Sequence, residues 1–275
     1  MVTRRDYRAE AVFAAKSVLI ELVHLLGEFR EEIVLVGGWV PELLFGEHEP
    51  PHTGSMDIDL ALDHRRLQEE GYRTIRELLL GRGYELGSQP FKFTRRIMIG
   101  DATYNVEVDL VAGEYEGTSR SHRHQKMQGI HAHKARGCDL AFESPKEIRV
   151  EGQLPGGGRD TVVVRVASIV PFLVMKGMAI ADRVKEKDPW DIDYCVRNYP
   201  GGMDPLILEF RPLLSNRLVQ EGLKKIGDAF ASVDQWGPVA VADFDEIADP
   251  EDRALRQRDS FERVNMLLER LRMHR

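Results

Sequence analysis

Cysteine is scarce in this chain of 275 residues, which contains only Cys138 and Cys195, far apart and without the spacing of metal ligands. A disulfide-rich framework is excluded, and we expect two buried free thiols rather than a disulfide. Long hydrophobic runs are also missing, because no apolar stretch approaches the roughly 20 residues that cross a bilayer. The N-terminus carries no signal-peptide pattern. We therefore expect a cytoplasmic protein with no membrane partner.

The chain also lacks an excess of basic residues. The formal net charge is −7 and the isoelectric point is about 5.8, which argues against a broad surface that coats nucleic acid but leaves room for a local basic groove. Hydrophobic residues make up 43% of the chain and charged residues 30%, which is ordinary for a soluble globular protein. The length allows one large domain or two smaller ones.

The N-terminal part of the chain mixes helical and strand-like patterns. An apolar stripe predicts a helix over residues 6–29, and residues 113–137 are polar, lack a period and are expected to form a long loop. We expect one helix at 39–45 and a second helix that Asp63 caps and that runs to Gly81. We also expect a hairpin of 91–99 and 103–111. Further strands are expected at 33–36, 57–62, 138–142, 147–151 and 161–166.

From Ser168 onward the pattern becomes helical. Asp188, Asp204 and Asp249 each precede a proline, and this pair is typical of a helix start. The sequence therefore predicts an α/β (α+β) domain with a mixed sheet over residues 1–166, followed by an all-helical domain over residues 167–275.

The most informative stretch runs from residue 33 to residue 60. A fully apolar strand ends at Gly37-Gly38, where backbone amides could approach a phosphate without a Cβ in the way. A second apolar run carries Asp57 and Asp59. Residues two apart on a strand point to the same face, about 6.6 Å apart, so these two carboxylates could share a divalent metal. The alternative is a pair of solvent-facing acids.

A third carboxylate strengthens the metal interpretation. Glu107 and Asp109 alternate with apolar residues on another strand-like run. If this strand lies beside the first, three acids converge, two holding Mg²⁺ (or Mn²⁺) and the third accepting a proton from an attacking hydroxyl. We favour Asp109 over Glu107 for that role because of its apolar flank, Leu110-Val111; the alternative is the solvent face of an antiparallel sheet.

A basic stripe opens the helical part. Lys176, Ile180, Arg183 and Lys187 share one face at helical spacing, and Lys176 lies among apolar residues. A lysine in such surroundings either reaches water or has an anionic partner, for which a nucleotide phosphate is our candidate. For Arg183 and Lys187 a solvated helix face is an equal alternative. Asp188 could simply be a helix cap, and Asp191 a first-turn acid.

Together these residues resemble the nucleotidyltransferase superfamily of DNA polymerase β type. The likeness covers roughly residues 33–195 and consists of Gly37-Gly38, the pattern Ser55-x-Asp57-x-Asp59 and a lone strand acid. The continuation through Lys176, Ala179, Arg183, Asp188 and Asp191 is similar to the nucleotidyltransferase toxins of abortive-infection and toxin–antitoxin systems. Trp39 stands where many members have a serine directly after the glycine.

The resemblance implies an enzyme that transfers a nucleoside monophosphate from a nucleoside triphosphate to an acceptor hydroxyl. It implies catalytic roles for Asp57, Asp59, Asp109 and Lys176, metal binding by the three aspartates, and nucleotide contacts from Gly37, Gly38, Ser55, Lys176, Arg183, Asp188 and Asp191. In the toxin-like relatives the acceptor is transfer RNA, and elsewhere it is a protein hydroxyl or an aminoglycoside. An antitoxin protein is the implied partner. A nucleotide-binding or regulatory module of the same fold without turnover is the competing hypothesis.

Two other motifs have weaker claims. His122, His124, His131 and His133 form two H-x-H pairs that invite a zinc site, although the basic loop around them could instead contact phosphate or be plainly solvated. Gly156-Gly157-Gly158 lacks the Lys-Ser/Thr of a phosphate loop and is predicted to be a hairpin turn.

Overall fold

A computed structural model of the protein describes residues 3–46, 48–67, 74–114 and 124–273. The chain forms two compact units. The sheet unit comprises residues 7–44 and 54–168, and the helical unit comprises residues 1–6, 45–53 and 169–275. The protein is thus a mixed α/β fold whose sheet is followed by helices, as expected. The sequence places the short segments 1–6 and 45–53 in the first domain, but in the structure they belong to the helical unit.

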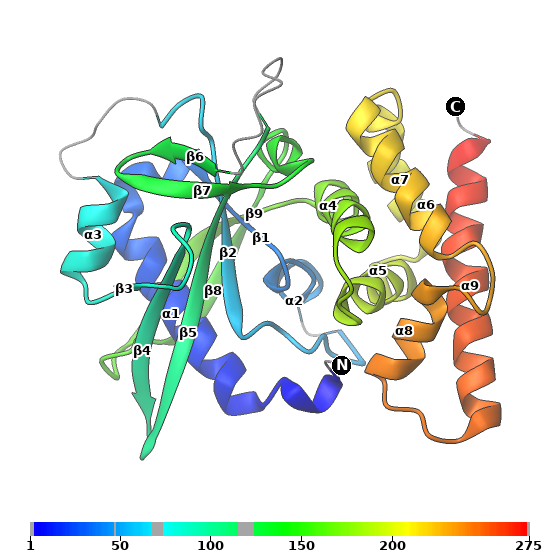
Figure 1. Ribbon diagram of the computed structural model, residues 1–275, viewed down its shortest axis with the longest axis horizontal. Coiled ribbons are helices and arrows are strands. Elements are labelled where there is room, and N and C mark those ends of the chain that lie inside the picture. Colours follow the sequence, from blue (N-terminus) through cyan, green and yellow to red (C-terminus); the bar gives the residue numbers. More distant parts are fainter. Residues whose placement is uncertain (1–2, 47, 68–73, 115–123, 274–275) are drawn as a thin grey trace. The chain divides into compact units, whose positions relative to one another are not determined.

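The sheet unit contains a mixed sheet whose strand order is β3-β4-β5-β2-β1-β9-β8, with β7 pairing to β5 and β6 to β7 (Figure 1). The strands are β1 (Ile33–Val36), β2 (Asp57–Leu62), β3 (Glu85–Leu86), β4 (Lys92–Ile99), β5 (Ala102–Ala112), β6 (His124–Met127), β7 (Ile130–Lys134), β8 (Lys146–Gln153) and β9 (Arg159–Val166). The helices are α1 (Ala9–Leu25), α2 (Trp39–Phe45) and α3 (Ile75–Gly81), with 3₁₀ turns η2 (Gly27–Glu32) and η3 (Cys138–Phe142). Strand β1 is entirely buried and lies between β2 and β9, which confirms its predicted central place.

Helix α1 packs on one face of this sheet (Figure 1). Its buried Glu21 accepts a hydrogen bond from Arg95 of β4, at 2.8 Å, and Arg95 lies opposite Val106 of β5. Because side chains alternate along a strand, Val106, Val108 and Leu110 face α1, whereas Glu107 and Asp109 face the other way. The alternation read from sequence therefore separates an apolar, helix-covered face from a polar one.

Three predicted elements of the sheet unit are wrong. Asp63 does not cap the helix that ends at Gly81; α3 begins after Thr74, which forms a capping box with Glu77. The loop expected over 113–137 contains β6 and β7, and its residues 115–123 lie outside the described residues. Residues 138–142 form η3 rather than a strand, because an apolar run of five residues does not distinguish the two.

Other expectations are confirmed. Strand β2 and the hairpin of β4 and β5 have nearly the predicted bounds. Residues 154–158 turn between β8 and β9, and the Leu154 amide donates to the Gly158 carbonyl at 2.7 Å. Cys138 and Cys195 are both buried free thiols, and burial raises the pKa of each.

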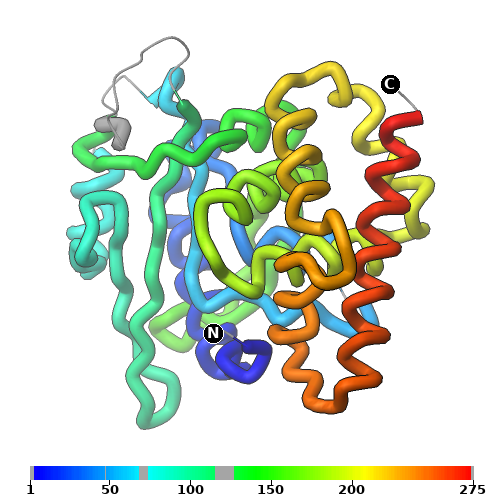
Figure 2. Tube along the Cα trace, turned by 45° about the vertical axis from the view of Figure 1, so that its right-hand side comes forward, coloured from blue at the N-terminus to red at the C-terminus, as the bar shows by residue number. Residues whose placement is uncertain are grey.

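The helical unit is built from η1 (Arg4–Asp6), α4 (Ile169–Asp182), α5 (Lys187–Asn198), α6 (Met203–Phe210), η4 (Arg211–Leu213), α7 (Arg217–Ala229), α8 (Trp236–Phe244) and α9 (Pro250–Arg272). Helices α4 and α7 approach closely, because a Cβ at Gly177 would lie 2.5 Å from the Gly222 carbonyl oxygen. Figure 2 follows the same path as a continuous tube from α4 to α9. No helix within the described ranges is long and apolar enough to span a bilayer.

Only one of the three Asp-Pro pairs is a helix cap. Asp249 accepts hydrogen bonds from the amides of Glu251 and Asp252 at the start of α9. Asp188 and Asp204 instead lie inside the first turns of α5 and α6, which begin one residue earlier. The capping interpretation of Asp188 is therefore wrong, and its carboxylate is used elsewhere.

Candidate active site on the open sheet face

Four carboxylates lie together on the sheet face opposite α1. Strands β2 and β5 run parallel and side by side (Figures 1 and 2), with Asp57 opposite Glu107 and Asp59 opposite Asp109. Paired strands lie about 4.8 Å apart, so the predicted adjacency of the two acidic strands is confirmed in register. Asp57, Asp59 and Asp109 are all partly buried. Such a group of like charges needs cations or donors to offset its repulsion.

Asp57 is anchored by two groups of the sheet unit. The hydroxyl of Ser55, itself buried, donates to Asp57 Oδ1. The Trp39 indole N–H donates to the Asp57 carbonyl oxygen at 3.0 Å. Ser55 thus orients a carboxylate of the site; its predicted contact with a nucleotide stays a prediction.

Gly37 makes room for Asp59. Val36 pairs with Asp59 across β1 and β2, and Gly37 follows with φ +71°. A Cβ at Gly37 would lie 1.9 Å from Asp59 Oδ2. Two non-bonded atoms cannot approach so closely, so any side chain at position 37 would collide with Asp59. Gly37, which the sequence associates with phosphate binding, is therefore also required by the close approach of the Asp59 carboxylate.

Gly37→Ala is expected to destabilise the protein more than Gly100→Ala, although both positions have positive φ. The left-handed backbone costs each alanine on the order of 1–2 kcal/mol, but only the alanine at position 37 collides with Asp59, since nothing lies within 4 Å of a Cβ at Gly100. Urea unfolding of both variants measures the difference. Equal losses would show that Asp59 does not depend on the missing Cβ.

Lys92 occupies the other side of Asp109, where sequence reasoning placed no site residue. It is the register partner of Asp109 on β4, and its Nζ lies 3.2 Å from Asp109 Oδ2 and 2.7 Å from Glu107 Oε2. Burial acts to lower the pKa of Lys92, but the bond to Glu107 and the charge of Asp109 outweigh it, so the pKa is raised. No local pattern could have found this residue, because its partners come from a register across strands.

Asp109 has the features of a proton acceptor. Burial raises the pKa of Asp109, and the Lys92 ammonium opposes that shift. The negative charges of Asp57 and Glu107 raise the pKa further, so that it lies above its usual value. Its Oδ1 atom is buried and, within the described part of the chain, has no hydrogen-bond partner. The Glu107 side chain is 53% exposed against 19% for Asp109, so the more buried acid is the one in register with Asp59.

The donor set is of the kind that binds Mg²⁺. Carboxylate oxygens from Asp57, Asp59 and Asp109 are hard ligands that leave further positions for phosphate and water. Among the residues that the structure describes, no group of three or more His, Cys, Asp and Glu side chains has the arrangement of a metal site. The unfilled Asp109 Oδ1 and the register with Asp59 nevertheless fit a cation that draws these side chains together.

The zinc expectation for the histidine pairs finds little support. His122 lies outside the described residues, and β6 places His124 opposite His133 of β7. The His133 ring packs at 4.9 Å from the Phe91 ring. His131 and His133, whose side chains the structure describes, contribute to no metal-holding group among the described residues.

The predicted nucleotide-binding residues of the helical unit form an internal ion network. Lys176 Nζ lies 2.6 Å from Asp188 Oδ1 and 2.7 Å from Asp191 Oδ2. Arg183 Nε binds Asp188 Oδ2 at 2.8 Å. Lys187 Nζ lies 2.8 Å from Asp191 Oδ1. Lys176 therefore has the anionic partner that its apolar surroundings required, and the partner is carboxylate from the next helix.

Two details of the predicted basic stripe are wrong. Helix α4 ends at Asp182, and Lys187 opens α5, so the four stripe residues do not share one helix. Lys187 is also buried, at 2% exposure, rather than solvated. The carboxyl of Asp188 is buried, which acts to raise its pKa, but the charges of Lys176 and Arg183 lower the pKa to about 2.

His52 completes this network from the segment 45–53. Its Nε2 lies 2.9 Å from Asp191 Oδ1 and its side chain is 1% exposed. Burial and the charge of Lys187 lower its pKa from 6.5 to about 4. His52 is therefore neutral in the native protein around neutral pH.

This shift predicts a loss of stability in mild acid. Between pH 6.5 and about 4, the unfolded chain binds a proton at residue 52 that the native protein does not, so stability falls as pH falls through this window. Between pH 7 and 5 the His52 contribution amounts to about 2 kcal/mol. His52→Gln should remove this part of the slope, as measured by urea midpoints at both pH values. Parallel slopes for the two proteins would contradict the assignment.

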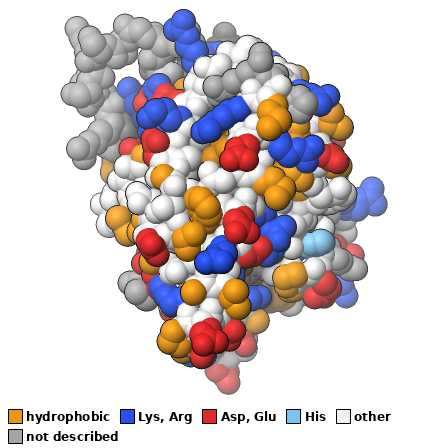
Figure 3. Space-filling model, turned by 90° about the vertical axis from the view of Figure 1, so that its right-hand side faces the viewer, with side chains coloured by type: hydrophobic (Ala, Val, Ile, Leu, Met, Phe, Trp, Pro, Cys, Tyr) orange, Lys and Arg blue, Asp and Glu red, His pale blue; other side chains and the backbone are white. Residues whose placement is uncertain are grey.

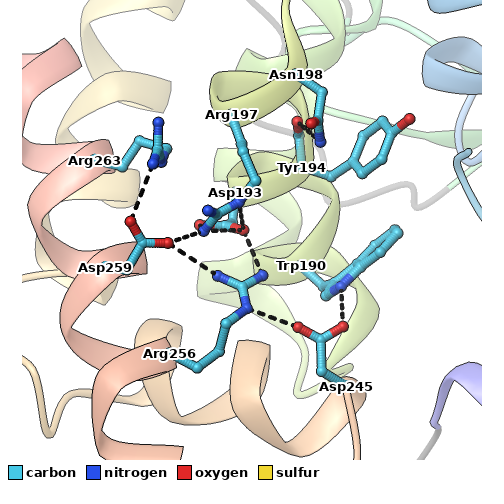
Figure 4. A network of polar contacts seen from close by, with 9 residues as sticks. All are labelled: Trp190, Asp193, Tyr194, Arg197, Asn198, Asp245, Arg256, Asp259 and Arg263. Atoms are coloured by element: carbon cyan, nitrogen blue, oxygen red, sulfur yellow. Dashed lines mark hydrogen bonds and ion pairs between the residues drawn. The ribbon is translucent and has the colours of Figure 1, made fainter. Parts of the chain in front are cut away.

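A second polar network lines a cavity of about 390 Å³ in the helical unit. Arg256 of α9 donates to Asp193 at 2.6 Å and to Asp245 at 2.8 Å, and Asp245 also accepts from the Trp190 indole at 2.8 Å (Figure 4). Arg197 and Asp259 join the same network (Figure 4). The i,i+4 pair Asp193–Arg197 is readable from sequence, whereas the long-range arginine is not. These charged groups chiefly satisfy one another.

Comparison of the chain with protein-family models, curated proteins and solved structures finds no match.

Proposed function

We propose that the protein is a Mg²⁺-dependent nucleotidyltransferase that moves a nucleoside monophosphate from a nucleoside triphosphate to an acceptor hydroxyl. The observation that carries the proposal is the register of Asp59 with Asp109, with Asp57 two residues earlier. These acids share the sheet face opposite α1. Like charges placed so close together repel one another unless cations or donors offset them, and metal-assisted phosphoryl transfer uses such carboxylates to hold its cation.

The three aspartates would hold the cation, with Mn²⁺ as a substitute. When bound, the metal neutralises negative charge that develops on the phosphate oxygens. Asp109 Oδ1, a buried acceptor, is suited either to ligate the metal or to receive a proton.

The reaction is an in-line displacement. Asp109 takes the proton of the acceptor hydroxyl, which its raised pKa favours. The acceptor oxygen forms a bond to the α-phosphorus, the bond between that phosphorus and the bridging oxygen breaks, and pyrophosphate leaves with the electron pair. Ser55 orients Asp57, and Gly37 admits Asp59, so the ground state already holds the carboxylates in place.

The nucleotide contacts stay predictions. Gly37, Gly38 and Ser55 would face the triphosphate from the sheet unit. In the helical unit Lys176, Arg183, Asp188 and Asp191 already bind one another, so a phosphate contact of Lys176 would add to its ion pairs with two buried acids.

The resemblance to abortive-infection and toxin–antitoxin nucleotidyltransferases favours transfer RNA as the acceptor and an antitoxin as the partner. Basic and acidic side chains intermingle with scattered apolar ones on the face that Figure 3 shows. This mixture does not resemble the continuous basic field of a nucleic-acid-coating surface, so a protein or aminoglycoside hydroxyl is kept as the alternative acceptor.

A nucleotide-binding module without turnover is the second candidate. The observation in its favour is Lys92, which already pairs with Asp109 and Glu107 and could serve in place of a catalytic cation. Thermal melting with Mg²⁺ and each triphosphate in turn tests for a nucleotide site, because a ligand stabilises the state that binds it.

The decisive experiment incubates the protein with Mg²⁺ and each α-³²P-labelled triphosphate, together with total RNA, protein extract or an aminoglycoside. The pool that becomes labelled identifies the acceptor. Stabilisation by nucleotide without labelling of any pool would favour the binding module.

A further inference from the structure

Asp109 lies between two neighbours of opposite charge. Its register partner on β2 is Asp59, and its register partner on β4 is Lys92. Because directly paired residues of a sheet project to the same face, the carboxylate of Asp109 can turn toward either neighbour. In this structure it lies 3.2 Å from the Lys92 ammonium.

Lys92 has a second and shorter contact on the same face. Its Nζ lies 2.7 Å from Glu107 Oε2, and Glu107 is two residues from Asp109 on β5. The lysine can therefore release Asp109 and keep a carboxylate partner. The exposed Glu107 would thus serve as the alternative partner of Lys92.

We infer that Lys92 is an internal counter-ion that holds Asp109 when no metal is bound and competes with a divalent cation for that carboxylate. The inference rests on the proposed function, because it concerns the same three aspartates. Lys92 is a positioning residue: it acts through Asp109 and Glu107. Metal binding shifts the Asp109 side chain from the β4 side toward Asp59, and Lys92 then pairs with Glu107 alone.

The test measures Mn²⁺ binding to the full chain by electron paramagnetic resonance of the free ion, without nucleotide. Lys92→Gln should bind Mn²⁺ on the order of tenfold more tightly than the unaltered protein at low ionic strength, because a positive charge beside one of the ligands of the dication is removed. Lys92→Arg keeps the charge and should stay close to the unaltered protein. Lys146→Gln, an exposed change on β8 of the same sheet, controls for net charge.

The outcomes separate the inference from the function. Mn²⁺ binding that Asp59→Asn removes and Lys92→Gln tightens supports both. Binding that Asp59→Asn removes but Lys92→Gln leaves unchanged or weakens overturns the role of Lys92 alone. Absence of Mn²⁺ binding in the unaltered protein and in Lys92→Gln overturns the metal site and the inference together. A merely structural lysine would lower the melting temperature on replacement without raising the affinity for the ion.

Discussion

Asp59→Asn is expected to lower nucleotidyl transfer at least about a thousandfold, the effect of losing some 4 kcal/mol of transition-state stabilisation at a metal-assisted centre. The amide cannot supply the anionic oxygen that the cation requires, and Asp59 lies beside both Gly37 and Asp109. Transfer of α-³²P label to the acceptor pool, measured at saturating Mg²⁺ and triphosphate, gives the rate.

The matched control is Asp101→Asn, the same chemical change at the exposed tip of the hairpin between β4 and β5. It should retain full transfer. Both variants should remain folded, because Asp59 lies among like charges whose repulsion the substitution relieves. A folded Asp59→Asn protein with unreduced transfer would exclude a metal-dependent mechanism at these residues.

Asp109→Asn should likewise lose more activity than Glu107→Gln if Asp109 receives the proton.

The second large effect concerns stability. Lys176→Met should cost about 3 kcal/mol or more, because removing one partner of a buried ion pair leaves charge without compensation. Asp188 and Asp191 are both fully buried, and Lys176 touches both. Arg183, Lys187 and His52 remain as partners, which keeps the loss from being larger. Urea unfolding monitored by circular dichroism measures it.

Lys224→Met provides the comparison. Lys224 forms an exposed pair with Asp228 at 3.1 Å in the same unit, and its replacement should change stability by about 0.5 kcal/mol or less. The double variant Lys176→Met, Asp188→Asn should lose less than the two single losses added together, since the second change removes a charge that the first left behind. Additive losses would contradict direct coupling of Lys176 to Asp188.

Local pattern was sufficient for the strands at and beside the acidic site. Strand β1 is uninterrupted Ile-Val-Leu-Val, and β5 alternates acidic and apolar residues, so burial and facing could be read from two-residue periodicity. The same rule was not sufficient for β6 and β7. Strand β7 alternates buried Ile130 and Ala132 with His131 and His133, but four or five residues inside a polar segment are too few to establish a period. The rule also failed for Cys138–Phe142, where five residues are too few to separate a 3₁₀ turn from a strand.

Long-range pairing set the limit for the site. Asp57, Asp59 and Asp109 could be proposed because each stands in a recognisable strand, but Lys92 could not, because its meaning comes from the register of β4 with β5. The capping interpretation of Asp188 fails for the same reason, while its predicted place among the nucleotide contacts stays a prediction. Its local context, a proline one residue later, favours a cap, yet the buried ammonium of Lys176 provides a stronger partner than a backbone amide.

The segment 45–53 decides when the helical unit can be finished. Its Pro50 carbonyl accepts a hydrogen bond from the Tyr194 hydroxyl at 3.0 Å, and its His52 reaches Asp191, partners that lie 144 and 139 residues further along the chain. During synthesis this segment leaves the ribosome long before α5 does. Its apolar and aromatic groups therefore stay uncovered until α5 has emerged. A gene cut at codon 168 would therefore separate α5 from a piece of its own core, and residues 169–275 encoded alone would lack the segments 1–6 and 45–53 of the helical unit.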